Sequence, residues 1–141
     1  MMNDKVLFSI VDTPTHPNFS PLYRRFGLKE IVLQSQRKAI SALKRQKPDF
    51  AVAEFIYTYH TYYQAVNISN LDVFLNSLVK YSPDTRVIVL VSKADREHVD
   101  ALNEIIPLHA VLTFPVSDGQ MEAALRGALN SRLVSPRNGG C

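Results

Sequence analysis

The sequence has almost none of the residues that link a chain covalently, and it has no long apolar run. Its only cysteine is Cys141, the last of 141 residues, which excludes an internal disulfide and a cysteine-based zinc site. No apolar stretch approaches the roughly 20 residues that cross a bilayer. The first residues, Met1-Met2-Asn3-Asp4, lack the charged-then-apolar order of a signal peptide. We therefore expect a soluble cytoplasmic protein that does not bind a membrane.

Glycine is also scarce, with five in the chain. Because no glycine-rich phosphate loop is present, the similarity of residues 91–95, Val-Ser-Lys-Ala-Asp, to the base-reading sequence of GTPases does not predict a nucleotide site. The histidines lie on different predicted elements without the spacing of metal ligands. They are His16, His60, His98 and His109, and we expect them on the surface, with only His60 near the predicted site.

The chain is mildly basic, with 16 lysines and arginines against 13 aspartates and glutamates, and a net charge of +3. Part of this charge falls in or next to one predicted helix, residues 36–46. The basic residues there are Arg37, Lys38, Lys44, Arg45 and Lys47. A charged helix face is usually a solvated face, so we do not expect nucleic acid as a partner.

Five short apolar runs predict β-strands buried on both faces. They are residues 5–11, 30–33, 50–55, 86–91 and 110–113. A helix is predicted after each strand. The first begins with Ser20 as its N-cap and Pro21 at its first position and stops at Gly27, and the second spans residues 36–46.

The remaining helices follow from capping signals and apolar stripes. The third opens at Ser69 with a capping-box pattern, and Ser117 opens the fifth in the same way. The apolar stripe of the third helix is Leu71, Phe74, Leu75, Leu78 and Val79; that of the fourth is Val99, Leu102 and Ile106; that of the fifth is Met121, Ala124, Leu125, Ala128 and Leu129. Strand and helix thus alternate five times, which favours an α/β fold with one parallel sheet and helices on both faces. We predict one domain, residues 1–133, and a disordered tail, residues 134–141.

Polar or special residues stand at the ends of four predicted strands: Asp12 after the first, Glu54 at the end of the third, Ser92 after the fourth and Pro115 after the fifth. In this order the sequence resembles the receiver domain of bacterial two-component response regulators, over residues 5 to about 131. The resemblance implies a flavodoxin-like (βα)5 doubly wound sheet of strand order 2-1-3-4-5. It also implies a role in phosphorelay signal transduction, with a kinase, an output domain or another regulator as protein partner.

Four positions depart from the receiver pattern. Thr13 replaces the second acid after the first strand, and Glu54 stands in place of the aspartate that accepts the phosphoryl group. Phe114 replaces the lysine before Pro115, and Val111 replaces the aromatic switch residue that pairs functionally with the hydroxyl at Ser92. These positions mark the phosphoacceptor equivalent, the remnant of the acidic pocket, the switch and the lost lysine.

Each departure weakens phosphoryl transfer. Magnesium favours clustered carboxylates, which here shrink to Asp12 and Glu54, and Phe114 supplies no cation. The longer glutamate moves the nucleophile by about an ångström, which can cost on the order of a hundredfold in rate. We therefore predict no enzymatic activity, and no cofactor or metal beyond weak Mg²⁺ binding. Two interpretations of Glu54 remain: a charge that holds an activated-like state with a hydrogen bond from Ser92, or a solvated residue at a site that has drifted.

A segment rich in aromatic residues follows the third strand. It contains Tyr57, Tyr59, His60, Tyr62 and Tyr63. Tyrosines are favoured in interfaces, so this segment is a candidate interaction loop, or its rings fill the lost acidic pocket. Ala123, Gly127 and Ser131 form a line of small residues on the fifth helix. Since receivers pair through the fourth helix, fifth strand and fifth helix, the resemblance makes a homodimer on this face a further hypothesis.

The leading interpretation is an atypical receiver that is not phosphorylated and acts through protein–protein contacts. The first alternative is a receiver that still accepts phosphate at an acidic site made of Asp12 and Glu54. The second is a flavodoxin-like module that binds a small ligand between Ser92, Tyr57 and Glu54.

Overall fold

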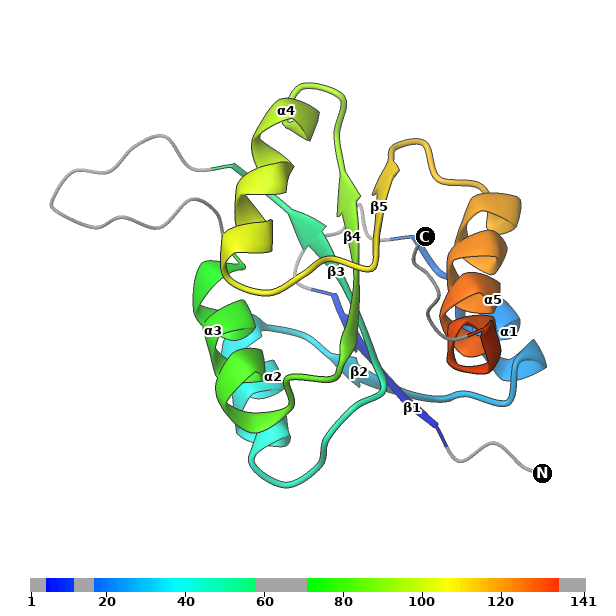
Figure 1. Cartoon of the computed structure of the whole chain (residues 1–141), viewed down its shortest axis with the longest axis horizontal. Helices are drawn as coiled ribbons and strands as arrows, with labels where there is room; N and C mark the ends of the chain where they lie inside the picture. The colour runs from blue at the N-terminus through cyan, green and yellow to red at the C-terminus, as the bar shows by residue number, and fades with distance from the viewer. Residues whose placement is uncertain (1–4, 12–16, 58–70, 135–141) are drawn as a thin grey trace, which may run out of the picture.

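The structure is a computed structural model that describes residues 5–11, 17–57 and 71–134, with side chains up to residue 127. Five parallel strands form one sheet in the order β2-β1-β3-β4-β5 (Figure 1). The strands are β1 (Val6–Ile10), β2 (Lys29–Leu33), β3 (Phe50–Phe55), β4 (Arg86–Val91) and β5 (Ala110–Thr113). This topology confirms the predicted α/β class and the doubly wound (βα)5 sheet.

Helices cover both faces of the sheet (Figure 1). One layer consists of α1 (Ser20–Arg25) and α5 (Asp118–Val134). The other consists of α2 (Gln36–Leu43), α3 (Asp72–Tyr81) and α4 (Arg96–Val99), which continues as the 3₁₀-helix η1 (Asp100–Glu104). No helix in the described ranges is both long and apolar enough to span a bilayer.

The alternation of side chains along the central strand divides the core into two parts. In β3, Ala51, Ala53 and Phe55 belong to the core under α2, α3 and α4, whereas Phe50 and Val52 belong to the core under α1 and α5. A strand covered on both faces needs apolar residues in both registers, which is why β3 reads as a continuous apolar run. Glu54 continues the second register, so its carboxylate lies on the α1–α5 face at the end of the strand.

Several helix boundaries differ from the predicted ones. Phe19, and not Ser20, occupies the N-cap of α1, and Gly27 follows the helix with a φ of 72°, a conformation that glycine adopts without strain. α2 is shorter than predicted and ends at Leu43. α3 begins at Asp72, and the predicted capping residue Ser69 lies outside the described residues.

The fourth helix is shorter and tighter than predicted. Only one turn is α-helical, and Asp100–Glu104 is a 3₁₀-helix. Asn103 explains this difference, because its Nδ2 donates to the carbonyl oxygen of Asp100 (3.2 Å) while its Oδ1 accepts from the backbone N of Leu108 (2.9 Å). Such side-chain bonds compete with the regular helical pattern. The predicted inner face is nevertheless correct, since Val99, Leu102 and Ile106 are buried.

The apolar stripe of α3 is correct except at its last member. Val79 is 44% exposed, because the eighth position after Leu71 is rotated by about 80° from it and reaches the edge of the stripe. The capping box of α5 is confirmed, with reciprocal hydrogen bonds between Ser117 and Gln120. α5 extends to Val134, the first residue of the predicted disordered tail, and residues 135–141 lie outside the described part.

Side-chain hydrogen bonds hold the loops at the amino edge of the sheet. Asp49 Oδ2 accepts from the backbone N of Val6 (2.9 Å), and the hydroxyl of Thr85 donates to the carbonyl oxygen of Pro48 (2.8 Å). The hydroxyls of Ser82 and Thr85 are hydrogen-bonded to each other at 2.7 Å, and both residues are buried. The loops before β3 and β4 are therefore fixed to each other at this edge.

Candidate functional site

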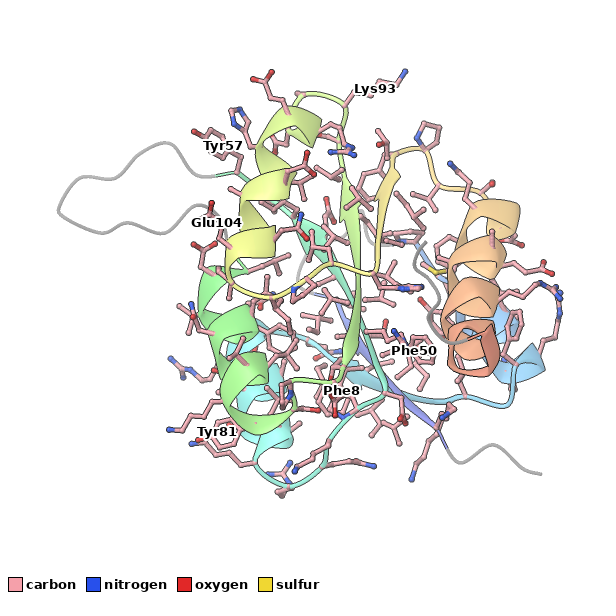
Figure 2. All side chains as sticks on the ribbon, viewed as in Figure 1. Phe8, Phe50, Tyr57, Tyr81, Lys93 and Glu104 are labelled. Carbon is pink, nitrogen blue, oxygen red and sulfur yellow. The ribbon has the colours of Figure 1, made fainter. Side chains whose placement is uncertain are left out.

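Three strand ends meet at the carboxyl edge of the sheet and surround an open hollow. Glu54 comes from β3, Ser92 and Lys93 follow β4, and Phe114 and Pro115 follow β5. Together these residues line a hollow of about 690 Å³. Figure 2 shows Lys93 in the loop between β4 and α4, at this edge of the molecule. Glu54, Ser92, Phe114 and Pro115, each predicted at the end of a strand, thus line one hollow, whereas Asp12 and Thr13 lie outside the described residues.

Phe114 contacts both the core and the hollow. Its side chain is half-buried and packs against the core under α1 and α5, and it also lines the hollow beside Glu54. Its backbone N donates to the carbonyl oxygen of Val91 (2.9 Å), which extends the β4–β5 pairing by one bond. Consequently the position where receivers have a lysine is here an apolar residue anchored in the core.

Val111, the position of the switch residue, lies on the other face of the sheet. It is half-buried and packs against the core under α2, α3 and α4. A valine here has no hydroxyl or ring that could follow a change at Ser92. The role of this position stays a prediction.

Ser92 belongs to the turn that begins α4. Its Oγ accepts a hydrogen bond from the backbone N of Asp95 at 3.3 Å, and its carbonyl oxygen accepts from the same N at 3.1 Å. The side chains of Ser92 and Lys93 are exposed. A donation from Ser92 to Glu54 stays a prediction.

Tyr57 is turned toward α4, as Figure 2 shows. Its ring is stacked on the ring of His98, with 3.6 Å between centroids and 4° between planes. Its backbone N donates to Asp95 Oδ2 at 3.2 Å. Tyr57 does not line the hollow of Glu54 and Ser92. A ligand crevice of Ser92, Tyr57 and Glu54 stays a prediction.

The stack also corrects the prediction for the histidines. His98 is half-buried and lies 3.3 Å from Glu97, measured from Nε2 to Oε2. His109 is half-buried too, and its Nε2 is 2.9 Å from the carbonyl oxygen of Ala124 in α5. Sequence spacing missed the stack of His98 on Tyr57, because the end of β3 and α4 are far apart along the chain. The other members of the aromatic segment, Tyr59, His60, Tyr62 and Tyr63, lie outside the described residues, as does His16.

Neither a metal site nor a dimer interface can be assigned. Among the residues that the structure describes, no three histidine, cysteine, aspartate or glutamate side chains are grouped as metal ligands would be. On α5, Ala123 and Gly127 are exposed, and a Cβ added to Gly127 would meet no atom within 4 Å. The side chain of Ser131 lies outside the described part. Pairing through α4, β5 and α5 stays a prediction.

The fold is shared with many solved structures, although no family model and no curated protein matches the sequence. A response regulator receiver domain protein from Clostridium thermocellum is similar with a TM-score of 0.69 and 19% identity, over 92% of this chain and 98% of that one. A CheY-like receiver domain protein from Methanospirillum hungatei JF-1 gives 0.68 and 10%, over 95% and 100%. A response regulator from Thermotoga maritima gives 0.66 and 12%, over 92% and 100%. The chain therefore has the fold of a response-regulator receiver domain.

Proposed function

We propose that this protein is a receiver-like signalling module that takes no phosphoryl group and acts through protein–protein contacts. The observation that carries the proposal is Phe114, which packs into the core and lines the hollow beside Glu54. In the receiver pattern this position holds a lysine. A neutral ring there offers no charge to an acyl phosphate.

The chemistry of acyl phosphate formation supports this proposal. The transferred phosphoryl group carries negative charge on its oxygens, and its transfer is accelerated by cations held in place for those oxygens. Phe114 removes one such cation, and Glu54 places the nucleophile farther from its strand than an aspartate would. Glu54 then serves as a fixed negative charge at the carboxyl edge. The module works as a binding partner of a kinase, an output domain or another regulator, inside the cell, without enzymatic activity of its own.

One observation favours a second candidate, a receiver that still accepts phosphate. Lys93 lines the same hollow as Glu54, and its ammonium group can approach a phosphoryl oxygen from the β4 side. Lys93 is exposed, so its position is less fixed than that of a lysine held at the end of β5. A flexible cation contributes less to catalysis than a preorganised one.

The two candidates differ in a direct mass measurement. The protein is incubated with Mg²⁺ and acetyl phosphate, and its intact mass is recorded. We expect no gain of a phosphoryl group in the wild type, and none in Glu54→Gln. The double variant Glu54→Asp with Phe114→Lys restores two features of the receiver pattern and measures how much of the missing reactivity they account for.

A gain of one phosphoryl group in the wild type that is lost in Glu54→Gln would replace the proposal by the second candidate. In that case Lys93→Gln shows how far phosphorylation depends on this lysine, because the variant removes the cation that lines the hollow and leaves the Glu54 carboxylate unchanged. A gain that persists in Glu54→Gln would mean phosphorylation at another residue, which leaves Glu54 a non-acceptor.

A further inference from the structure

The outer surface of α2 and α3 carries a group of cations that we call the basic face. Its members are the exposed side chains of Arg37, Lys38, Lys44, Arg45, Lys47 and Lys80. The first four lie on or directly after α2, Lys47 follows them, and Lys80 is in the last turn of α3. Both helices belong to one layer and are in direct contact, so the six cations come from neighbouring segments of that layer. Figure 1 shows the two helices on the same side of the sheet.

These cations are not neutralised by nearby carboxylates. None of the six forms an ion pair with any residue in the described ranges. Asp72 of α3 is buried, and Asp49 accepts a hydrogen bond from the backbone N of Val6. Asp84, in the turn after α3, is exposed and is the nearest acid in sequence to Lys80. The basic face is thus a region of positive potential over a mildly basic protein.

Two of the cations stand where helix stability disfavours them. Arg37 and Lys38 lie in the first turn of α2, where the helix dipole is positive and anions are preferred. Ser35 caps this helix through its Oγ, which accepts from the backbone N of Lys38 at 3.1 Å. In a full capping box the residue at position 38 is glutamate or glutamine and bonds back to the N-cap backbone, which a lysine cannot do because it has no acceptor. The chain forms such a capping box at Ser117 and Gln120. Helix stability therefore does not explain the lysine at position 38 of α2.

Exposed apolar side chains also lie on α3. Val73 is 55% exposed and Val79 is 44% exposed, and both are on α3. Val73 and Lys80 are two helical turns apart and point the same way. Among the described residues, Tyr81 is the aromatic neighbour of Lys80; it is half-buried, and Lys80 Nζ lies 5.3 Å from its ring centroid. It is therefore not available as a stacking platform for a nucleic-acid base.

We propose that the basic face binds an acidic, amphipathic segment of a partner protein. Carboxylates of the partner pair with the α2 cations, and its apolar side chains cover Val73 and Val79. A phosphate backbone would use the cations but would leave the valines exposed, so the valines favour a protein segment over a nucleic acid or a lipid headgroup. This surface lies apart from the hollow of Glu54, and the proposal holds whether or not Glu54 accepts phosphate.

The test uses a fluorescein-labelled peptide with leucines on one helical face and glutamates on the other, and fluorescence anisotropy at low and high salt. We expect Lys38→Gln with Arg45→Gln to weaken binding about tenfold, since two charge contacts are lost. Val73→Ala with Val79→Ala should weaken it about fivefold at either salt concentration. The matched control, Arg24→Gln with Lys29→Gln, removes the same charge from exposed sites outside the basic face and should bind like the wild type. All substituted side chains are exposed, and thermal unfolding verifies that each variant is folded.

Double-stranded DNA and vesicles containing phosphatidylserine are titrated in parallel. The proposal requires the peptide to bind more tightly than either, and only peptide binding to depend on the valines. If DNA or vesicles bind more tightly than the peptide, and the valine substitutions do not change that binding, the basic face binds phosphate polyanions and the proposal fails. It fails equally if the peptide does not bind at low salt, or if the control pair weakens binding as much as Lys38→Gln with Arg45→Gln does.

Discussion

The surface between α1 and α5 differs from the surface of α2 and α3 in how its arginines and lysines are paired. Between α1 and α5, Arg25 and Arg126 both pair with Glu122, and Arg126 also lies 5.7 Å from the ring centroid of Phe26. On the opposite layer the six cations of the basic face have no ion-pair partner among the described residues. In the same layer Arg96 of α4 pairs with Asp100, so the contrast lies between the α1–α5 surface and the α2–α3 surface. The net charge of +3 does not reveal this, because it sums both layers.

Each helix layer covers a core of large buried side chains. The largest predicted changes in the free energy of unfolding come from substitutions in these two cores. Phe74 of α3 and Met121 of α5 are both fully buried. We expect Phe74→Ala to lower the free energy of unfolding by about 3–5 kcal/mol and Met121→Ala by about 2–5 kcal/mol. Urea unfolding measures both. If only one of them destabilised the protein, the two layers would differ in their packing as well as in their charge.

The second prediction concerns Tyr23, a fully buried residue of the α1–α5 layer. Its hydroxyl has no hydrogen-bond partner among the described residues. Burial raises the pKa of the Tyr23 hydroxyl above its ordinary value of 10, and the nearby Glu30 carboxylate raises it further. The unfolded chain ionises this group near pH 10 and the folded protein does not, so the unfolded state binds fewer protons above that pH.

Stability should therefore fall as the pH rises above about 10, with a contribution from Tyr23 of up to about 1.4 kcal/mol per pH unit. Tyr23→Phe should remove this contribution, and at neutral pH it should leave stability unchanged or raise it by about 1 kcal/mol, since no hydrogen bond is lost. Urea unfolding of both proteins between pH 7 and about 11 measures the difference. Equal slopes above pH 10 would contradict the assignment.

The third prediction concerns the contact between Tyr57 and His98, which joins the end of β3 to α4. A double-mutant cycle with Tyr57→Ala and His98→Ala should give a coupling energy of about 0.5–1.5 kcal/mol, the usual value for an aromatic pair. The backbone bond from Tyr57 to Asp95 remains in every variant, so the cycle isolates the rings. A coupling energy near zero would mean that the stack does not stabilise the protein.

The smallest predicted effects compare the surface charges of the two layers directly. Lys38→Glu should raise the free energy of unfolding by about 0.3–1 kcal/mol, because it completes a capping box with Ser35 and places an anion at the helix N-terminus. Glu122→Gln should lower it by at most about 1 kcal/mol, since exposed ion pairs are weak. Both effects should shrink at high salt. If Lys38→Glu destabilised the protein, Lys38 would have a folding role and the basic face would lose part of its support.

Much of the fold could be predicted because its signals are local. The apolar runs of β3 and β4 and the Ser117–Gln120 capping box each specify an element through neighbouring residues, and all three are correct. The 3₁₀-helix after α4 could not be predicted from the spacing of Val99 and Leu102. Its cause is the pair of hydrogen bonds made by Asn103, which competes with a helix that the apolar pattern alone favours.

The candidate site likewise has features that the sequence predicted and features that it did not. Glu54, Ser92 and Phe114 could be grouped in advance because the carboxyl ends of parallel strands meet at one edge. The stack of Tyr57 on His98 could not, since α3 and β4 separate the two residues along the chain and no periodic pattern connects them. Lys93 lies in the same hollow as Glu54, at a place set by the turn into α4.

The strand order has a consequence for how the fold is assembled and lost. β1 is hydrogen-bonded to β2 on one side and to β3 on the other, while β2 and the four-residue β5 are the edge strands. Every neighbouring pair is parallel, so no hairpin can start the sheet, and each pairing waits for a helical crossover. We expect amide protons of β1 and β3 to exchange with solvent only on global unfolding, and those of the two edge strands, β2 and β5, to exchange through smaller openings. The protein thus has its slowest exchange in the middle of the sheet and its fastest strand exchange at the two edges.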